Sequence, residues 1–523
     1  MSLIQNPGTE RTAPARVRLP VRVRVKAPTK GPVNGRAREV AAPFKMPKFR
    51  APKFPRRVFD IRDHGAIADG KTDCTTAIKS AIASCVETGG GRVLIPAGDW
   101  LTGPIHLASN VNLHVDEGAV VRFSDDAADY LPPVFVRWAG QECFNYSPLI
   151  YARDCTNIAI TGRGTLLGQG TKWWRWAKAE QRASGKLYQM AVEGLPVEQR
   201  RFGSPEQPLR PQFILPINCT DVLLEDFTIA EGGPFWTVHV AYCENVCIRG
   251  LKIDAAEGPN NDGIVIDSSR NVVIEDCHLQ SSEDCVSLKS GLNEDGWRVN
   301  KPTENVIVRR VKATRGKGGM TIGSDMSGGV RNVFVHDCVY DGPQVGIRLK
   351  AARGRGGVVE DVYIQDIEMG RIGGDAIQLT TEYKSFVKPD GKAPIFRNIR
   401  IRNVTCKDAA TAARMVGLPD APLRDFILQN ITISSEEGLY CASANGIHLL
   451  DVRVTPRIGP VLALKDSRDV VIDGLNHSDN GGVFLDLRGR QTKGVRLRGE
   501  SRVPVRPAVV LGIDVPRDAL VHE

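Results

Sequence analysis

A short pattern of alternating apolar residues returns from residue 110 to residue 494, and it restricts the possible folds more than any other property of the sequence. In each copy a turn-forming residue is followed by an apolar, any, apolar arrangement, as in Asn157-Ile-Ala-Ile-Thr-Gly and Asp221-Val-Leu-Leu-Glu-Asp. The later copies begin at Asn245, Asn271, Asn305, Asn332, Asp361, Asn398, Asp425, Gly446, Asp469 and Gly494. From residue 221 to residue 494 the spacings are 24, 26, 34, 27, 29, 37, 27, 21, 23 and 25 residues.

This repeat predicts an all-β solenoid. Alternation of apolar and polar residues marks short half-buried strands, and Asn, Asp or Gly before each strand suits a tight turn with positive φ. Repeats of 20 to 30 residues that contain strands stack into a coil. Leucine-rich repeats share the period, but their fixed leucine spacing is absent. We therefore expect one chain wound as a single-stranded parallel β-helix.

The residues before the array predict a short helix that caps its open end. Asp73 can cap this helix, and Gly89-Gly90-Gly91 ends it before Arg92-Val-Leu-Ile-Pro enters the first strand. Its apolar face is formed by Ala77, Ile78, Ala81, Ile82 and Cys85. Two stretches, roughly 124–150 and 168–212, interrupt the repeat, and we expect them to form walls on the binding face.

Charge separates residues 1–57 from the rest of the chain. They hold 15 of the 69 Lys and Arg residues, 2 of the 60 Asp and Glu residues and 9 of the 32 prolines. We interpret them as an extended or disordered leader without the apolar segment of a signal peptide, and residues 58–523 as the β-helix domain. The basic charge lies outside that domain, so no nucleic-acid partner is predicted. No apolar run is long enough to cross a membrane.

The twelve cysteines are scattered and include no CxxC pair. We expect them to pack as small buried side chains inside the coil, with a disulfide framework as the alternative.

Four polar clusters recur at intervals close to one turn of the coil. They begin at Asn260, Glu283, Arg315 and Gly346, and equivalent residues are 21–22, 33–34 and 31 positions apart. Stacked turns lie about 4.8 Å apart, so such residues lie above one another. The predicted column contains Asp262, Glu283, Asp284, Lys317, Arg348 and Lys350.

The residue types in this column fit the cleavage of a glycosidic bond. That reaction needs one carboxylic acid to protonate the leaving oxygen and a carboxylate to activate water, and crowding of carboxylates raises one pKa. Arg348 and Lys350 suit a substrate that is itself an acid. Asn-Asp-Gly, however, is a turn signal in any β protein. Glu283 and Asp284 are neighbours, so both can face one site only at a turn or bulge.

Several ordered motifs resemble glycoside hydrolase family 28, the polygalacturonases and rhamnogalacturonan hydrolases, over roughly residues 58–440. They include Phe59-Asp60-Ile-Arg-Asp63-His-Gly65, Pro234-Phe-Trp-Thr-Val-His239, Gly258-Pro-Asn-Asn-Asp-Gly263, Met320-Thr-Ile-Gly-Ser324 and Gly354-Arg-Gly-Gly-Val-Val359. The resemblance implies a right-handed parallel β-helix of the pectin-lyase type that hydrolyses pectic polysaccharide with inversion. Asp262 and Asp284 would activate water and Glu283 would be the general acid. The substrate-binding residues would be Asn260, Lys317, Arg348, Lys350 and Tyr383, with no metal or cofactor.

Three positions depart from the family pattern. Glu283 stands where the family has Asp, Lys317 replaces the His of a Gly-His-Gly motif, and Val265 replaces an Asp. Three outcomes therefore stay open: hydrolysis of polygalacturonate, hydrolysis of another linkage such as one in rhamnogalacturonan, or carbohydrate binding without catalysis. Ca²⁺-dependent elimination of the pectate-lyase type is a further alternative. The resemblance to bacterial members favours exo action, and the family resemblance implies a secreted or periplasmic location. We expect a monomer.

Overall fold

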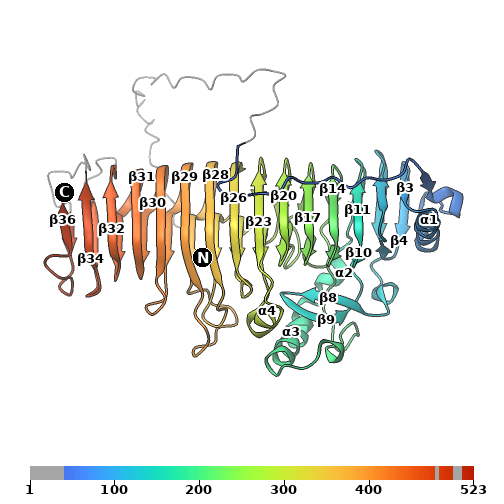
Figure 1. The fold of residues 1–523 in the computed structure, drawn as a ribbon, viewed down its shortest axis with the longest axis horizontal. Helices are drawn as coiled ribbons and strands as arrows, with labels where there is room; N and C mark the ends of the chain where they lie inside the picture. Colours follow the sequence, from blue (N-terminus) through green and yellow to red (C-terminus); the bar gives the residue numbers. More distant parts are fainter. Residues whose placement is uncertain (1–39, 477–481, 499–508) are drawn as a thin grey trace, which may run out of the picture. The chain divides into compact units, whose positions relative to one another are not determined.

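The repeats form a 34-stranded parallel sheet that winds into a β-helix (Figure 1). The computed structural model describes residues 40–476, 482–498 and 509–523. Each turn of the coil, here called a rung, contributes strands to three parallel stacks. The predicted parallel β-helix is thus confirmed.

The three stacks are defined by their strands. The first stack contains β5 (Ile105–His106), β10 (Ile150–Arg153), β13 (Ile214–Ile217), β16 (Val238–Ala241), β19 (Ile264–Asp267), β22 (Asp284–Lys289), β25 (Gly318–Gly323) and β27 (Val345–Lys350). The second stack contains β1 (Val58–Asp60), β3 (Gly91–Ile95), β6 (Val111–Val115), β11 (Thr156–Thr161), β14 (Thr220–Glu225), β17 (Glu244–Arg249), β20 (Arg270–Glu275), β23 (Thr303–Arg309) and β26 (Val330–Tyr340). The third stack contains β2 (Asp69–Asp73), β4 (Gly98–Thr102), β7 (Ala119–Phe123), β12 (Thr165–Leu167), β15 (Thr228–Ala230), β18 (Lys252–Ala255), β21 (His278–Ser281) and β24 (Lys312–Arg315).

Later rungs are more continuous. Four strands each run around most of a turn: β28 (Val358–Thr380), β29 (Ile395–Val416), β30 (Leu423–Ala442) and β31 (Ala444–Lys465). The described array ends with β32 (Arg468–Asp473), β33 (Leu485–Arg488), β34 (Lys493–Arg498), β35 (Val509–Leu511) and β36 (Leu520–His522).

The repeat landmarks adopt the backbone conformation that their residue types predict. All twelve, from Asn157 to Gly494, have positive φ, between 50° and 73°. Several also bond from rung to rung: Asn305 Nδ2 donates to Asn271 Oδ1 at 2.9 Å, and Asn332 Nδ2 donates to Asn305 Oδ1 at 3.0 Å. Asn and Asp tolerate this conformation and carry a side chain that can pair with its neighbour.

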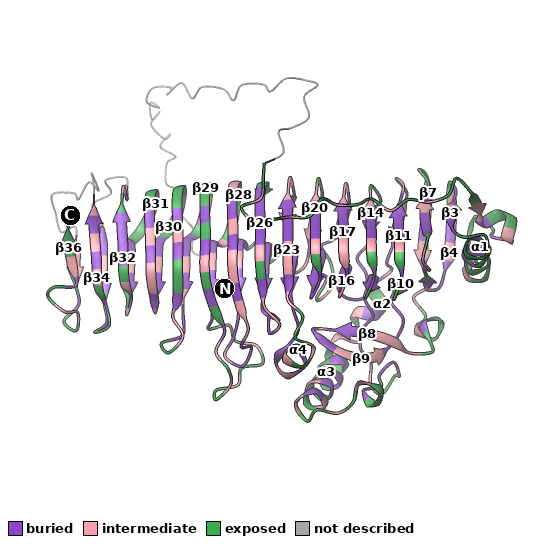
Figure 2. Cartoon of the chain, in the orientation of Figure 1, coloured by how far each residue is buried: buried purple, intermediate pink, exposed green. Residues whose placement is uncertain are grey.

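Apolar side chains stack along the inside of the coil, and Figure 2 shows buried residues in purple on strands along the whole array. Val222, Val246, Val272, Val306 and Val333 follow one another in register, and all are fully buried. Each buried side chain of this kind contributes about 1.5–3 kcal/mol. All twelve cysteines are buried thiols, which confirms the packing interpretation over the disulfide framework.

The capping helix α1 (Thr75–Glu87) buries the five predicted residues. It begins after Cys74, and the carboxylate of Asp73 accepts a hydrogen bond from Thr75 N at 2.9 Å. The expectation that Arg92 enters the first strand is wrong, because β1 and β2 precede it. Strand β2, Asp-Gly-Lys-Thr-Asp, contains no apolar residue, so no apolar alternation in the sequence predicts it. It joins the sheet through backbone pairing with β4.

Both predicted insertions leave the coil on the side of the first stack. The first contains the 3₁₀ helix η2 (Ala127–Tyr130) and a hairpin of β8 (Val134–Trp138) and β9 (Gln141–Asn145). The second contains α2 (Thr171–Trp174), α3 (Ala177–Val192) and η3 (Val197–Gln199), and a later loop contains α4 (Asn293–Val299) (Figure 1). A further 3₁₀ helix, η1 (Ile61–His64), lies before β2.

Residues 42–57, here called the arm, precede β1 and run extended across the second stack. Residues 1–39 of the predicted leader lie outside the described residues, and the division of the chain at residue 57 stays a prediction. Within the described residues, no helix is both long and apolar enough to span a membrane.

Candidate active site

Three carboxyl groups meet on two adjacent rungs of the first stack. Asp262 lies in the turn before β19, and Asp284 is the first residue of β22. Gly263 N donates to Asp284 O at 2.9 Å, which sets the two rungs side by side. Glu283 occupies the bend between β21 and β22. Strict strand alternation does not apply in a bend, so the neighbouring residues Glu283 and Asp284 can both face the same site.

Asp284 is buried between two cations. Lys350 Nζ lies 2.7 Å from its Oδ2 and Arg348 Nη1 lies 3.3 Å from its Oδ1. Burial alone would raise the pKa of Asp284, but Lys350, Arg348 and Lys289 outweigh it and hold the pKa well below its usual range. Asp284 is therefore ionised at neutral pH.

Asp262 has the opposite electrostatic environment. It is 4% exposed, and its nearest cation, Lys289, lies 3.7 Å from its carboxylate. Burial, assisted by the charges of Asp284 and Glu283 and opposed by Lys289, raises the pKa of Asp262 to about 7. Asp262 can thus hold a proton near neutral pH.

Glu283 forms an ion pair with Lys317 on the next rung. Lys317 Nζ lies 2.5 Å from Glu283 Oε1, and the backbone N–H of Lys317 donates to the Glu283 carbonyl oxygen at 2.6 Å. Burial alone would lower the pKa of Lys317, but the hydrogen bond and charge of Glu283 raise it. Two of the three departures from the family pattern, Glu283 and Lys317, are therefore in direct contact.

A cavity of about 420 Å³ opens over these groups. Asp262, Glu283, Asp284, Lys350, Asn260 and Tyr383 line it. Tyr383 presents its ring to Arg348 and Lys350, with 5.7 Å and 5.4 Å from the cations to the ring centroid. All eight predicted site residues therefore lie together at this cavity, by lining it or by contacting a residue that does.

The sequence prediction missed Lys289, Trp236 and Asp325, which also line the cavity. Lys289 Nζ lies 3.7 Å from carboxylate oxygens of both Asp262 and Asp325, and 4.8 Å from the centre of the Trp236 ring. Alternation along β22 would place Lys289 opposite Asp284. However, Cys285 and Val286 both point into the core, and this break returns Lys289 to the face of Asp284.

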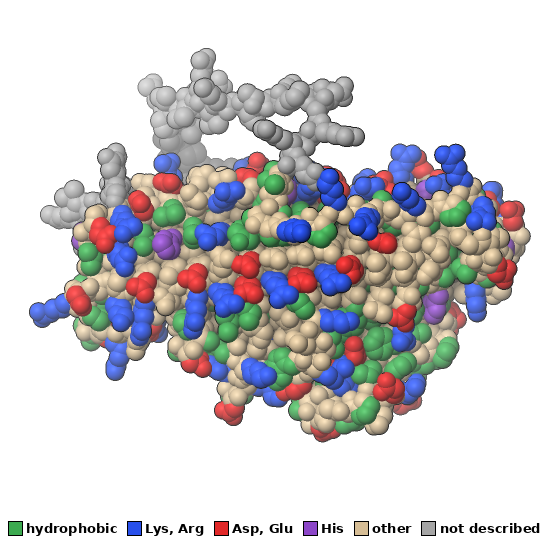
Figure 3. Space-filling view, viewed as in Figure 1, with side chains coloured by type: hydrophobic (Ala, Val, Ile, Leu, Met, Phe, Trp, Pro, Cys, Tyr) green, Lys and Arg blue, Asp and Glu red, His purple; other side chains and the backbone are tan. Residues whose placement is uncertain are grey.

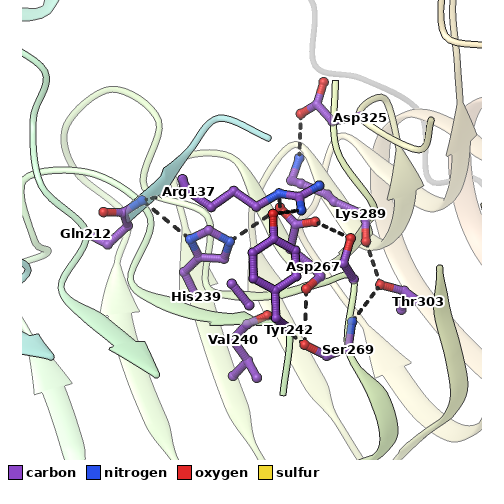
Figure 4. A network of polar contacts seen from close by, with 12 residues as sticks. Arg137, Gln212, His239, Val240, Tyr242, Asp267, Ser269, Lys289, Thr303 and Asp325 are labelled. Atoms are coloured by element: carbon purple, nitrogen blue, oxygen red, sulfur yellow. Dashed lines mark hydrogen bonds and ion pairs between the residues drawn. The ribbon is translucent and has the colours of Figure 1, made fainter. Parts of the chain in front are cut away.

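The first wall of the cavity is tied to the site by a buried ion pair (Figure 4). Arg137, on β8 of the hairpin, places its Nε 3.0 Å from Asp267 Oδ2 at the end of β19, and both side chains are at most 1% exposed. His239 Nε2 lies 3.5 Å from the same oxygen, and Asp267 is the register partner of Lys289. Burial lowers the pKa of His239, so this ring is neutral. The buried ion pair therefore ties the hairpin to the strand that follows Asp262.

The second wall, helix α3, is anchored by Arg210. Its Nη2 donates to Glu180 Oε1 of α3 at 2.6 Å and to Asn260 Oδ1 at 2.9 Å. Its Nη1 donates to the Pro259 carbonyl oxygen at 2.7 Å. Arg210 thus connects α3 to the turn that carries Asp262.

The third wall is the loop of Tyr383 to Phe386, which Arg355 holds in place. The buried guanidinium donates to carbonyl oxygens of Ser324 and Ser385 at 2.9 Å each, and to Asn293 Oδ1 at 2.8 Å. The Phe386 ring lies 5.0 Å from that of Tyr188 on α3, so the second and third walls meet. Within the described residues, no three His, Cys, Asp or Glu side chains are grouped as metal ligands would be.

The fold and the site together indicate a class of enzyme, the polysaccharide-cleaving β-solenoids, because clustered carboxyls face cations in a cavity of a parallel β-helix. Comparison with known proteins identifies the family. Glycosyl hydrolases family 28 matches residues 203–448. A probable polygalacturonase from Vitis vinifera is 32% identical over 384 residues, which cover 71% of this chain and 73% of the relative. An exo-poly-alpha-D-galacturonosidase from Dickeya chrysanthemi is 23% identical over 413 residues, with 72% of this chain and 67% of that protein covered.

Among solved structures, a hyperthermoactive exopolygalacturonase from Thermotoga maritima superposes with a TM-score of 0.71 and 35% sequence identity, and covers 75% of this chain and 92% of its own. The chain belongs to glycosyl hydrolases family 28. It is therefore a glycoside hydrolase, as the sequence resemblance predicted.

Proposed function

We propose that this enzyme hydrolyses polygalacturonate from the chain end, with inversion at the anomeric carbon. The observation that carries the proposal is the meeting of Asp262, Glu283 and Asp284 on adjacent rungs beside Lys350 and Arg348. The acids supply proton transfer and water activation, and the cations fit a sugar that carries a carboxylate. The names of the grape, Dickeya and Thermotoga relatives support the same substrate class.

The charges around each carboxyl suggest its role. Asp284 stays ionised beside Lys350 and is suited to activate water. We assign proton donation to Glu283, which faces the cavity. Three carboxyls so close together share their protons, so the proton that burial favours on Asp262 can pass to Glu283. Lys317 must leave Glu283 for this transfer, and a substrate carboxylate that binds Lys317 would draw it away.

Action at the chain end is supported by the walls of the cavity. The hairpin contributes Trp138 and Gln141, α3 contributes Glu180 and Ser184, and the loop contributes Phe386. The contact between Tyr188 and Phe386 joins two of these walls. A cavity flanked by these three walls favours a chain terminus over the middle of a polymer. The names of the Thermotoga and Dickeya relatives agree with this mode.

Product analysis tests the proposal. Polygalacturonate should release short uronates from the start of the reaction, and proton NMR should show the inverted anomer first. A mixture of long fragments at early times would contradict exo action, and the retained anomer would contradict inversion. An unsaturated product that absorbs in the ultraviolet and requires Ca²⁺ would indicate elimination. Asp284→Asn serves as the inactive control.

Hydrolysis of a different pectic linkage, such as one in rhamnogalacturonan, is the second candidate. It is favoured by the Glu283–Lys317 pair and by Val265, which is buried among the wall aromatics where the family has a polar acid. Faster release from rhamnogalacturonan than from polygalacturonate would select it. Either substrate is a polymer outside the cell, so we propose a secreted or periplasmic location.

A further inference from the structure

The arm crosses the outside of the second stack with one face turned to the coil and one to solvent. Phe44, Met46, Phe49, Pro52 and Phe54 are half-buried. The basic residues between and after them are exposed: Lys45, Lys48, Arg50, Lys53, Arg56 and Arg57. The arm therefore presents its cations outward in a single line, and Figure 1 shows it in dark blue along one edge of the coil.

Paired hydrogen bonds fix the position of the arm on two of the repeat landmarks. Arg50 N donates to Asn245 Oδ1 at 3.1 Å, and Asn245 Nδ2 donates to Arg50 O at 2.9 Å. Lys53 and Asn157 make the same pair, at 2.9 Å in both directions. Asn157 and Asn245 are two rungs apart. Three residues of arm thus span two rungs, or about 3.2 Å per residue, which is fully extended chain.

Apolar contacts also hold the arm on the second stack. Phe49 and Phe54 pack against Ala159, Leu223 and Cys247, which form a small cluster on the outer face of the second stack. Phe44 lies further along the coil, with its ring centre 6.5 Å from that of Tyr363. The three phenylalanines recur every five residues, which is about 16 Å of extended chain or just over three rungs. The three rings therefore contact the coil at intervals along its length.

The cations of the arm differ from those of the strands beneath it. On the second stack Arg side chains pair with Glu on the neighbouring rung, as in Arg249–Glu225, Arg309–Glu275 and Arg331–Glu304. In the part of the chain that the structure describes, none of the six arm cations forms such a pair, and residues 40–57 contain no Asp or Glu. Lys and Arg side chains follow this edge in Figure 3. The arm thus carries its cations, outside any ion pair among the described residues, over about 38 Å of chain.

We propose that the arm is a second, noncatalytic binding site for the polyuronate chain. This inference rests on the substrate class proposed above. A polyuronate carries one carboxylate per sugar along an extended chain, which matches a line of cations on a rigid support. No arm residue lines the catalytic cavity, so the sugars held on the arm are not the sugars at the catalytic acids. Holding the polymer raises the local concentration of chain ends near the cavity.

The observations favour a polyuronate over a nucleic acid. Single-stranded nucleic acids are held by aromatic side chains on which bases stack, but the three phenylalanines of the arm are turned toward the coil. Charge-only contacts of exposed Lys and Arg are individually weak, so the arm needs a repeating anion such as the enzyme's own polymeric substrate. The interaction should be strongly salt-dependent.

The test uses the full chain with Lys45, Lys48, Arg50 and Lys53 changed to Gln, which leaves the phenylalanines in place. A matched control changes Lys79, Lys252, Lys312 and Lys407, which are exposed and lie off the arm, to Gln and has the same net charge. Both sets are made in an Asp284→Asn background, and binding to polygalacturonate is measured by affinity electrophoresis. We expect the arm variant to bind roughly tenfold more weakly at low salt, the control to bind as its parent does, and the difference to vanish near 1 M salt.

In the active background, the arm variant should show a higher KM on polymer and unchanged kcat/KM on trigalacturonate. Equal weakening of the two variants, or unchanged polymer binding by the arm variant, would overturn the proposal. Arm-dependent binding of duplex DNA without arm-dependent binding of polygalacturonate would overturn it in favour of a nucleic-acid partner. Absence of trigalacturonate cleavage by the parent enzyme would contradict the proposed catalytic function, and this outcome is distinct from the outcomes that test the arm.

Discussion

Replacing Lys350 by Met removes the closest partner of the buried Asp284 carboxylate. The two groups are 2.7 Å apart and their side chains are 7% and 2% exposed. Removing one partner of a buried ion pair typically costs about 3–5 kcal/mol. Arg348, at 3.3 Å, then remains as the contacting cation. Asp284 can relieve the penalty by taking up a proton. At about 1.4 kcal/mol per pH unit, this penalty corresponds to a rise of roughly 2–4 in the pKa of Asp284, toward its ordinary value of 3.8.

Two measurements follow from this shift. The acid limb of kcat/KM should move to higher pH, because water activation needs ionised Asp284. Stability should change with a defined sign. In the parent the pKa of folded Asp284 lies below that of the unfolded chain, so its contribution is present above about pH 4 and is lost as pH falls further. Because the pKa of folded Asp284 lies well below its usual range, the difference in Tm between parent and Lys350→Met should be largest at pH 7 and should shrink progressively as the pH falls below about 4.

The control is Lys312→Met, since Lys312 is exposed on the third stack. It should leave Tm and the pH profile unchanged. A Lys350→Met enzyme with the parent's pH profile, or with the same loss of Tm at pH 7 and pH 3, would refute the proposed electrostatic role of Lys350.

Three further substitutions test the surroundings of the site. Asp262→Asn should lower kcat/KM by about 10²-fold or more and remove any inflection of the pH profile near pH 7. Folded Asp262 keeps its proton up to about pH 7, so the parent should lose stability between pH 4 and pH 7. The variant should not, and thermal melts at both pH values will show the difference. Lys317→Met should raise KM for uronate oligomers while changing unfolding free energy by less than about 1 kcal/mol, because the pair is partly exposed; a large Tm loss with unchanged KM would contradict this. Arg355→Met should leave the Ser324 and Ser385 carbonyl oxygens without their hydrogen-bond donor and lower the free energy of unfolding by about 2–3 kcal/mol. It should also speed protease cleavage near Phe386. Equal cleavage rates in parent and variant would count against the anchoring role of Arg355.

Local sequence was enough to predict the coil because each rung repeats one local rule. The landmark residues need positive φ, and alternation after each landmark sets which side chains face inward. The column of Asp262, Asp284 and Lys350 followed from the same rule, since residues one turn apart must lie near one another. Predicting these residues required no knowledge of contacts between distant parts of the chain.

The features that the sequence did not reveal depend on exceptions to that rule or on distant contacts. Lys289 reaches the site only because Cys285 and Val286 both point inward. The Arg137–Asp267 and Arg210–Glu180 pairs join an insertion to a rung, so no local spacing encodes them. The buried Arg355 was visible only as part of a family motif. Its partners lie in three separate segments.

The long excursion of residues 168–213 leaves the coil after β12 and returns at β13 without disturbing the sheet, because β13 still pairs with β10, and β14 with β11. The entrance to the cavity is therefore built by an insertion that is separate from the stacked strands, except where Arg210 contacts Pro259 and Asn260. Exchanging this segment for one of another length that keeps those contacts should change which polymer ends can enter, while the acids keep their relative placement. New specificities could thus arise by remodelling the rim alone.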